Sequence, residues 1–173
     1  RAGSNTPGKV MDNVAHVSGN LILRTDGTLW AWGPDNFGAR GNGSAPGDGA
    51  VPVKVLDHVV DAWSFTMFAG QTCCYALTED GSLYSWGCNI GGALGYEGGD
   101  SVYQPSPMLG LSDIPYQSAP RKTDLTGVAD LAGDGGFLLI LKEDGSLWGI
   151  NTTLGGISLS HTPVKIMDGV KVP

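Results

Sequence analysis

The stretch that decides the fold is YALTEDGSLYSWG, at residues 75–87. In it an alternating apolar run leads into Asp80-Gly81, and a second run carrying aromatic residues follows. An Asp-Gly pair between two such runs is the strongest short-range signal for a β-hairpin, because a tight turn needs residues that tolerate positive φ. The pattern recurs as LILRTDGTLWAWG at 21–33 and LILKEDGSLWGIN at 139–151. The sequence therefore predicts an all-β protein with three similar hairpins.

A two-residue Asp-Gly turn of type I′ would set the pairing inside each hairpin. In the second hairpin it places Leu77 opposite Tyr84 and Cys73 opposite Cys88. The other two hairpins then carry an aliphatic residue opposite an aromatic one at the same level, as similar stacked sheets would. We therefore expect the aromatic side chains in the core, with a ligand-binding platform as the alternative: Trp30, Trp32, Trp86 and Trp148.

A second signal is a proline followed two residues later by a lysine, and then by β-branched residues. It occurs at Pro7, Pro52, Pro120 and Pro163, at intervals of 45, 68 and 43 residues. A period of about 45 residues built from short strands is typical of β-propeller blades. We divide the chain into blade-like repeats at 7–51, at 52–119 with an insertion at 96–119, and at 120–162, followed by the first strand of a fourth repeat at 163–173.

A glycine-rich turn follows the first two hairpins, as WGPDNFGARGNG at 32–43 and WGCNIGGALGYEG at 86–98. With this turn the chain resembles the regulator of chromosome condensation repeat family, best over AGQTCCYALTEDGSLYSWGCNIGGALG at 69–95. Cys73 stands where that family often has histidine, and the third repeat lacks the Trp-Gly. The resemblance, to bacterial members in particular, covers nearly the whole chain. It implies propeller blades of antiparallel strands, in a family whose rings usually close with seven blades.

Three repeats do not close such a ring, so the two end blades would each keep an open apolar face. Either the chain is part of a longer protein or other chains complete the ring. Residues 6–17 and 162–172 are versions of the same strand and would compete for one position in a simple head-to-tail ring. This favours part of a longer protein, and we expect self-association through the open faces in both cases.

Composition and charge exclude several classes of partner. The chain has 173 residues, 28 of them glycine, and a net charge of −7. Without a basic run, binding to nucleic acid or to an anionic membrane surface is not expected. The longest clean apolar run, residues 137–141, is too short to enter a bilayer as a spanning helix.

The sequence shows no pattern of catalytic or metal-binding residues. Nucleophile elbows, zinc-binding helices and phosphate loops are absent, so we expect no enzyme, no cofactor and no metal. Three cysteines without a CxxC pair make neither a disulfide framework nor a zinc site. Buried free thiols are the favoured interpretation, and a bridge between Cys73 and Cys88 is the alternative.

The insertion YEGGDSVYQPSPMLGLSDIPYQSA, at residues 96–119, is the most suggestive segment for binding. A long loop that prolines stiffen on a rigid β scaffold is a common place for function, and tyrosines suit an interface. The alternative is a variable loop without a partner. The candidate contact residues are three tyrosines and three acids: Tyr96, Glu97, Asp100, Tyr103, Asp113 and Tyr116.

Together these features indicate a non-enzymatic propeller scaffold for protein–protein interaction. The segments KVMDNV at 9–14 and DGTLWAWG at 26–33 resemble secreted or surface members of the family in bacteria, which implies an extracellular or cell-surface location. Inhibition of a secreted enzyme, as by a β-lactamase inhibitor of the same fold, is the main alternative. Guanine-nucleotide exchange on a small GTPase, the activity of the eukaryotic prototype, is a weaker one.

Overall fold

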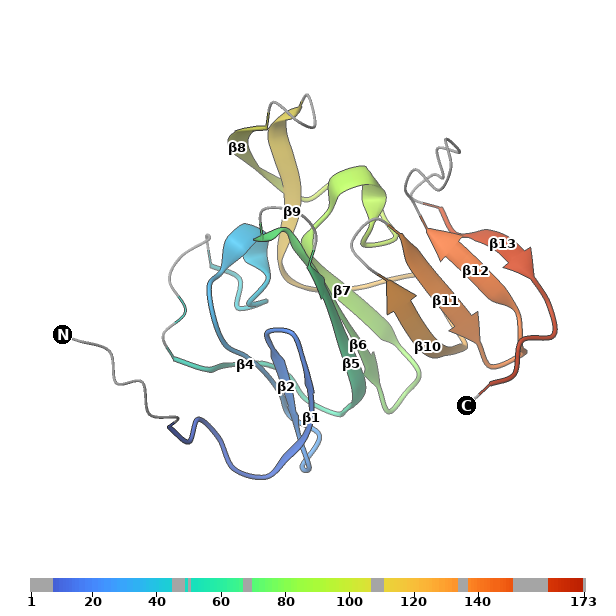
Figure 1. Cartoon of the computed structure of the whole chain (residues 1–173), viewed down its shortest axis with the longest axis horizontal. Helices are drawn as coiled ribbons and strands as arrows, with labels where there is room; N and C mark the ends of the chain where they lie inside the picture. Colours follow the sequence, from blue (N-terminus) through green and yellow to red (C-terminus); the bar gives the residue numbers. More distant parts are fainter. Residues whose placement is uncertain are drawn as a thin grey trace.

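A computed structural model describes residues 8–44, 49, 51–66, 70–106, 111–133, 137–150 and 162–172, with backbone alone for 101–106, 111 and 112. These residues form three antiparallel β-sheets. In Figure 1 the sheets follow one another across the molecule in chain order, like neighbouring blades of a propeller. The predicted all-β, blade-type fold is confirmed.

The first sheet has the order β1-β2-β3-β4, with β1 (Val14–Ser18), β2 (Leu21–Arg24), β3 (Leu29–Ala31) and β4 (Val53–Leu56). The second has the order β5-β6-β7-β9-β8, with β5 (Val59–Thr66), β6 (Thr72–Thr78), β7 (Leu83–Cys88), β8 (Asp100–Ser106) and β9 (Leu111–Lys122). The third has the order β10-β11-β12-β13, with β10 (Val128–Gly133), β11 (Leu138–Lys142), β12 (Leu147–Ile150) and β13 (Val164–Met167). Short 3₁₀ turns, η1 (Asn36–Gly38) and η3 (Ile90–Gly92), follow β3 and β7.

The sheets and the sequence repeats differ in phase by one strand. β4, which the repeats place at the start of the second unit, is hydrogen-bonded to β3 and completes the first sheet. In the same way β13, from the 163–173 segment, pairs with β12 in the third sheet. Each proline-lysine segment thus supplies the outer strand of one blade before the chain enters the next.

The predicted two-residue turns are wrong, and so is the register that follows from them. Thr78 and Ser82 close a three-residue turn, with Thr78 N donating to Ser82 O at 3.0 Å and Gly81 N donating to Thr78 O at 2.8 Å. Gly81 alone takes a positive φ, of 77°. This is the type I turn followed by a glycine bulge, the other common hairpin loop that ends in glycine.

The turn shifts every pair in the hairpin by one residue. Leu77 lies opposite Leu83 and Cys73 opposite Gly87, so the predicted Leu77–Tyr84 and Cys73–Cys88 pairs do not form. The first and third hairpins show the same shift. A one-residue change of register moves the side chains of one strand to the opposite face relative to their partners. The register therefore decides which side chains meet between the sheets.

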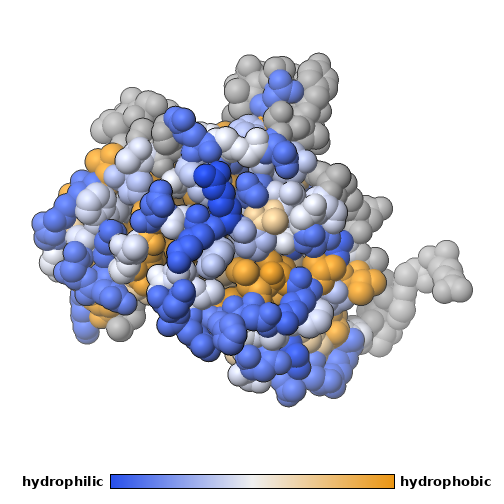
Figure 2. Space-filling model, turned by 180° about the vertical axis from the view of Figure 1, so that it is seen from behind, coloured by the Kyte–Doolittle hydropathy of each residue, from blue (hydrophilic) through white to orange (hydrophobic). Residues whose placement is uncertain are grey.

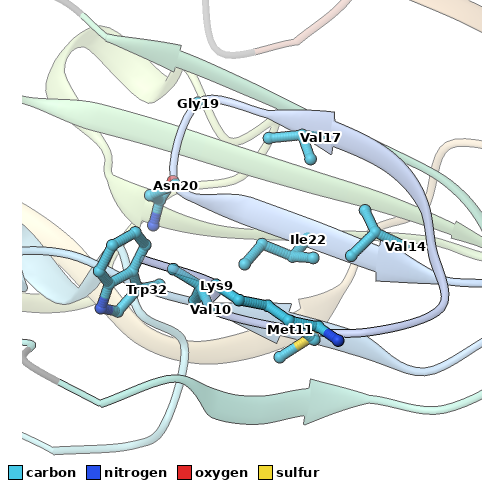
Figure 3. Close-up of a pocket in the computed structure, with 9 residues that line it drawn as sticks. All are labelled: Lys9, Val10, Met11, Val14, Val17, Gly19, Asn20, Ile22 and Trp32. Carbon is cyan, nitrogen blue, oxygen red and sulfur yellow. The ribbon is translucent and has the colours of Figure 1, made fainter. Parts of the chain in front are cut away.

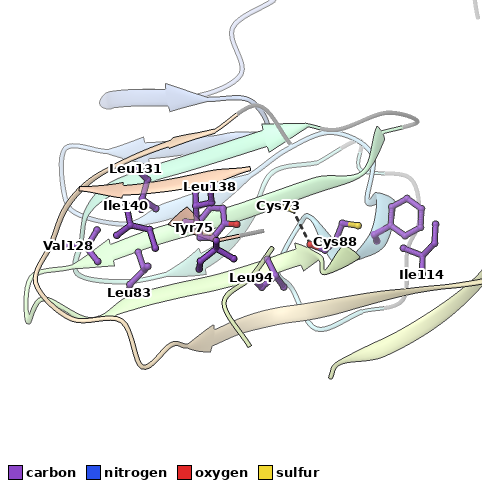
Figure 4. Packing of buried hydrophobic residues seen from close by; sticks show 12 residues of the cluster. Cys73, Tyr75, Leu83, Cys88, Leu94, Ile114, Val128, Leu131, Leu138 and Ile140 are labelled. Atoms are coloured by element: carbon purple, nitrogen blue, oxygen red, sulfur yellow. Dashed lines mark hydrogen bonds between the residues drawn. The ribbon is translucent and has the colours of Figure 1, made fainter. Parts of the chain in front are cut away.

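Two hydrophobic clusters join the three sheets. Between the first and second sheets, Leu21, Leu23 and Leu29 pack against Ala62, Cys74, Ala76 and Trp86. Between the second and third sheets, Tyr75 and Leu83 meet Leu131, Leu138 and Ile140, as Figure 4 shows. The middle sheet consequently packs through apolar residues on both of its faces.

The four tryptophans of the hairpins differ in how deeply they are buried between the sheets. Trp86 is fully buried, and its indole N–H donates to Ala39 O at 3.1 Å in the first blade. Trp30 and Trp148 are half-buried, and each donates its indole N–H to the hydroxyl beside its own turn, Thr28 and Ser146. The expectation of a buried core position holds for Trp86 and is wrong for Trp32, which is 42% exposed.

Gly41 makes room for Trp86. A Cβ built on Gly41 would lie 2.7 Å from Trp86 Nε1, and the residue has a φ of +65°. Gly43 has a similar φ of +74° but nothing within 4 Å of the built Cβ. The two positions therefore share the backbone strain and differ in the clash.

We predict that Gly41→Ala lowers the free energy of unfolding by about 2 kcal/mol more than Gly43→Ala does, because only the first overpacks the contact between sheets. Denaturant unfolding followed by tryptophan fluorescence measures both. Equal losses in the two variants would mean that Trp86 does not depend on this space.

The turn aspartates accept hydrogen bonds that favour the ionised carboxylate. The Thr78 hydroxyl donates to Asp80 Oδ1 at 2.6 Å and Ser82 N at 3.1 Å, and these bonds lower the pKa of Asp80 to about 2. The equivalent Asp26 and Asp144 also have lowered pKa values, mainly through hydrogen bonds from Thr28 and Ser146.

Because the pKa of Asp80 is lower in the folded state, its contribution to stability should be present above pH 4 and disappear as the pH falls from about 4 to about 2. We expect carboxyl ¹³C shifts to show Asp80 titrating near pH 2, and Asp80→Asn to remove this part of the pH dependence of unfolding. Titration near the ordinary value of about 4 would contradict the hydrogen-bonded turn.

Candidate functional site

The segment chosen as a binding loop is a β-hairpin. β8 and β9 pair in antiparallel fashion, with Val102 opposite Ile114, and they form the edge of the second sheet. Figure 1 shows this hairpin standing out from the rest of the sheet, beyond the end at which η1 lies. The segment expected to be a long, proline-stiffened loop is therefore strand at 100–106 and 111–119, and residues 107–110 lie outside the described part.

β9 holds the hairpin to the scaffold because it belongs to two pairings. Its second half pairs with β7, Cys88 lying opposite Tyr116, while its first half pairs with β8. Ile114 is 1% exposed and belongs to the cluster between the second and third sheets. The base of the hairpin is therefore fixed by the core.

Asn89, which the sequence analysis did not single out, fastens the chain that leads into the hairpin. Its amide nitrogen donates to Tyr96 O at 3.1 Å and to Gly98 O at 2.9 Å, while its Oδ1 accepts from Leu94 N at 3.1 Å. Its backbone N–H donates to Pro115 O at 2.8 Å in β9. The sequence did contain a signal for this role: Asn89 ends the apolar stretch WGCN at 86–89, and an amide side chain buried there needs hydrogen-bond partners.

Two of the three candidate tyrosines serve the scaffold. Tyr96 is half-buried, and its hydroxyl donates to Ser85 O at 3.1 Å. The guanidinium carbon of Arg121 lies 4.2 Å from the centre of its ring, and burial raises the pKa of Tyr96. Tyr116 is half-buried and packs against the core cluster.

The three candidate acids remain exposed. Glu97 and Asp100 lie where the chain enters the hairpin, with Asp100 opposite Tyr116, and Asp113 lies opposite Tyr103 nearer the tip. The backbone of Tyr103 is in β8, and its side chain lies outside the described part. The exposed carboxylates therefore lie at separate levels, Glu97 and Asp100 beside the tyrosines at the base of the hairpin and Asp113 nearer its tip.

The three cysteines are free and buried. Cys73 donates its thiol to Cys88 O at 3.0 Å, and Cys74 donates to Ala39 O at 3.5 Å. Burial raises the pKa of Cys74 to about 12 and that of Cys88 to about 11, so the thiols stay protonated near neutral pH. They act as small core residues.

Within the described ranges, no three or more His, Cys, Asp or Glu residues lie where they could share a metal ion. Nor does the described part contain a helix that is long and apolar enough to cross a membrane.

We predict that Asn89→Ala speeds amide hydrogen exchange over residues 96–100 and costs about 2 kcal/mol, because it leaves buried partners unsatisfied. The exposed Asn42, whose Oδ1 accepts from Ser44 N, is the matched control as Asn42→Ala. Unchanged exchange at 96–100 in the Asn89 variant would show that the hairpin is held by other contacts.

The repeated sheets, the turn geometry and the interlocking of successive blades define a β-propeller-type repeat protein. Residues 80–119 match the family model described as the regulator of chromosome condensation (RCC1) repeat. This part of the chain is therefore an RCC1 repeat, as the sequence resemblance implied.

Relatives and solved structures agree with this assignment. Human E3 ubiquitin-protein ligase HERC2 is 33% identical over 91 residues, which cover 53% of this chain and 2% of that protein. The regulator of chromosome condensation of Drosophila melanogaster is 31% identical over 102 residues, or 55% of this chain and 18% of that protein. The structure of yeast RCC1 (Prp20) bound to Kap60 superposes with a TM-score of 0.65 at 20% identity, covering 92% of this chain and 38% of that one.

The chain therefore spans less than a fifth of these two curated relatives and about two fifths of the yeast propeller. The likeness to yeast RCC1 concerns the fold.

Proposed function

We propose that this chain is a non-enzymatic scaffold that presents the β8–β9 hairpin to a partner protein. The observation that carries the proposal is the contrast within the hairpin. Its base is locked by Ile114 and Asn89, whereas the side chains of Glu97 and Asp100 at that base, and of Asp113 further out, are exposed to solvent. Rigid presentation lowers the entropy lost on binding, which is how a scaffold gains affinity.

The charge of the exposed part indicates the chemistry of the partner. Three carboxylates on the hairpin of a chain with a net charge of −7 attract a basic surface and repel an acidic one. Tyr96 and Tyr116 contribute by holding the hairpin in place. A protein partner also agrees with the yeast relative, whose structure was solved with Kap60 bound.

The proposal places the protein outside the cell or on a bacterial cell surface, as the segments KVMDNV and DGTLWAWG led us to expect. A secreted enzyme with a basic rim around its active site is then one class of partner, and binding would inhibit it. Guanine-nucleotide exchange would need a small GTPase as the partner.

The test compares the 173-residue chain with the double variant Asp100→Lys/Asp113→Lys. The control is Glu143→Lys, which reverses the charge of an exposed acid at the turn of the third sheet. Each is immobilised and exposed to an extract and a culture supernatant of the source cells, and to a panel of purified β-lactamases and small GTPases. We expect a partner that the wild type and Glu143→Lys retain, and that the double variant binds at least about tenfold more weakly.

Salt supplies a second measure, because binding through exposed carboxylates should weaken steeply between about 0.1 and 0.5 M salt. Equal binding by the double variant would overturn the assignment to the hairpin. Turnover of a substrate by the isolated chain would overturn the non-enzymatic function. Inhibition of a β-lactamase, or nucleotide release from a GTPase, would identify which kind of partner the hairpin serves.

A further inference from the structure

We propose that the outer edge of β8 takes up an extended segment of the partner protein as an additional β-strand, and that this segment carries lysine or arginine side chains. The inference rests on the proposed function, since it names the chemistry by which the β8–β9 hairpin holds its partner. It follows from the backbone pairing of the hairpin.

β8 is the last strand of its sheet. The order β5-β6-β7-β9-β8 gives it β9 on one side, and no strand of the described ranges pairs with its other side. An edge strand presents unpaired backbone N–H and C=O groups, and these form the template to which a strand of another chain is added.

A hydrogen bond of β9 identifies which residues of β8 carry the free groups. Pro115 O accepts from Asn89 N at 2.8 Å, so the backbone groups of Pro115 face the β7 side of β9 and not β8. Ser101 lies opposite Pro115, and in an antiparallel pair both residues at such a position turn their groups outward. Because the groups alternate along a strand, Tyr103 is free like Ser101, while Val102 between them pairs with β9. The open edge therefore offers the N–H and C=O of two alternate residues.

The open edge is short. β8 changes register with β9 between Tyr103 and Ser106, and Pro105 in this stretch has no N–H to donate. A short edge with a charged residue at its start, here Asp100, resists the pairing of whole sheets. It leaves room for one short segment that pairs with Ser101 and Tyr103.

β8 belongs to the middle sheet, which packs against a described sheet on each side (Figure 1). A further blade would join the row next to the first or the third sheet, and not next to this edge. The apolar groove of Figure 3, with Val17, Ile22 and Trp32, lies instead on the face of the first sheet that has no described neighbouring sheet. Seen from behind, hydrophobic residues gather over the body of the molecule, away from the place where the hairpin projects (Figure 2). The edge of β8 is therefore separate from the apolar faces between blades.

Charge selects the chemistry of the added segment. Asp100 precedes the open edge, Asp113 lies opposite Tyr103, and both acids are exposed. With Glu97 and a net charge of −7, they repel a second copy of this chain and attract lysine or arginine. Side chains alternate between the two faces of a strand, so basic residues at alternate positions of the segment would share one face.

Amide hydrogen exchange followed by NMR tests the open edge directly. In the free protein we expect the amides of Ser101 and Tyr103 to exchange fast and the amide of Val102 to be protected, because Val102 alone of the three pairs with β9. The probe is a short peptide of alternating lysine and valine, and the control peptide has glutamate in place of lysine. At saturation the basic peptide should slow exchange at Ser101 and Tyr103 at least about tenfold, and the acidic peptide should leave it unchanged.

Two matched variants test the backbone contact. Ser101→Pro removes one outward N–H without removing a bond to β9, whereas Ser101→Ala changes the same side chain and keeps the N–H. We expect Ser101→Pro to bind the basic peptide at least about tenfold more weakly than Ser101→Ala. Protection of the Val102 amide shows that the hairpin is intact in both.

N-methylated peptides give a second measurement on the unaltered protein. An added strand turns the N–H groups of every second residue toward β8. Methylation of one alternate set, all lysines or all valines, should therefore abolish the protection, and methylation of the other set should preserve it. Equal effects of the two sets would contradict strand addition.

The inference and the proposed function fail in different ways. Unchanged exchange at Ser101 and Tyr103 with the basic peptide, or equal binding by Ser101→Pro and Ser101→Ala, would overturn the added strand. A protein partner that needs Asp100 and Asp113 but not the Ser101 N–H would also overturn it, while keeping the hairpin as the binding element. The proposed function fails when the partner binds Asp100→Lys/Asp113→Lys as tightly as the wild type.

Discussion

A β-sheet that is apolar on both faces is stable in water only when both faces are covered, and this constraint organises the molecule. Leu21, Ile22 and Leu23 are three consecutive apolar residues in one strand, so their side chains lie on both faces of the sheet. The middle sheet satisfies the constraint by lying between two others. The end sheets have one covered face each, and their open faces remain apolar.

The contact between blades is more specific than apolar burial alone would require. Trp86 of the second blade donates to the carbonyl of Ala39 in the first, and Gly41 leaves the space for its ring. Within the second blade, Tyr75 donates its hydroxyl to Ala93 O at 2.6 Å. The hydrogen bond from Trp86 adds a directional contact between the first two blades, while the leucines supply the buried area.

The hairpin and the blade core perform different tasks although β9 belongs to both. Where β9 pairs with β7 it is an ordinary outer strand, and where it pairs with β8 it leaves the blade and carries the exposed Asp113 outward. Because the hairpin extends a core strand, that strand holds it in place without additional core. Tyr96 and Tyr116 pack at the base of this extension, and the Tyr96 hydroxyl also donates to Ser85 O.

The sequence alone determined the class of the protein: the three Asp-Gly hairpins, the repeat length and the RCC1 motif follow from local pattern. Local pattern did not determine the register, because Asp-Gly suits a type I′ turn and a three-residue bulged turn equally well. Only the tertiary structure decided it: Trp86 lies opposite Cys74, and its indole N–H donates to Ala39 O in the first blade. It alone also showed that residues 100–106 and 111–119 pair as strands near a base that Asn89 anchors, because that depends on contacts between segments that no local window contains.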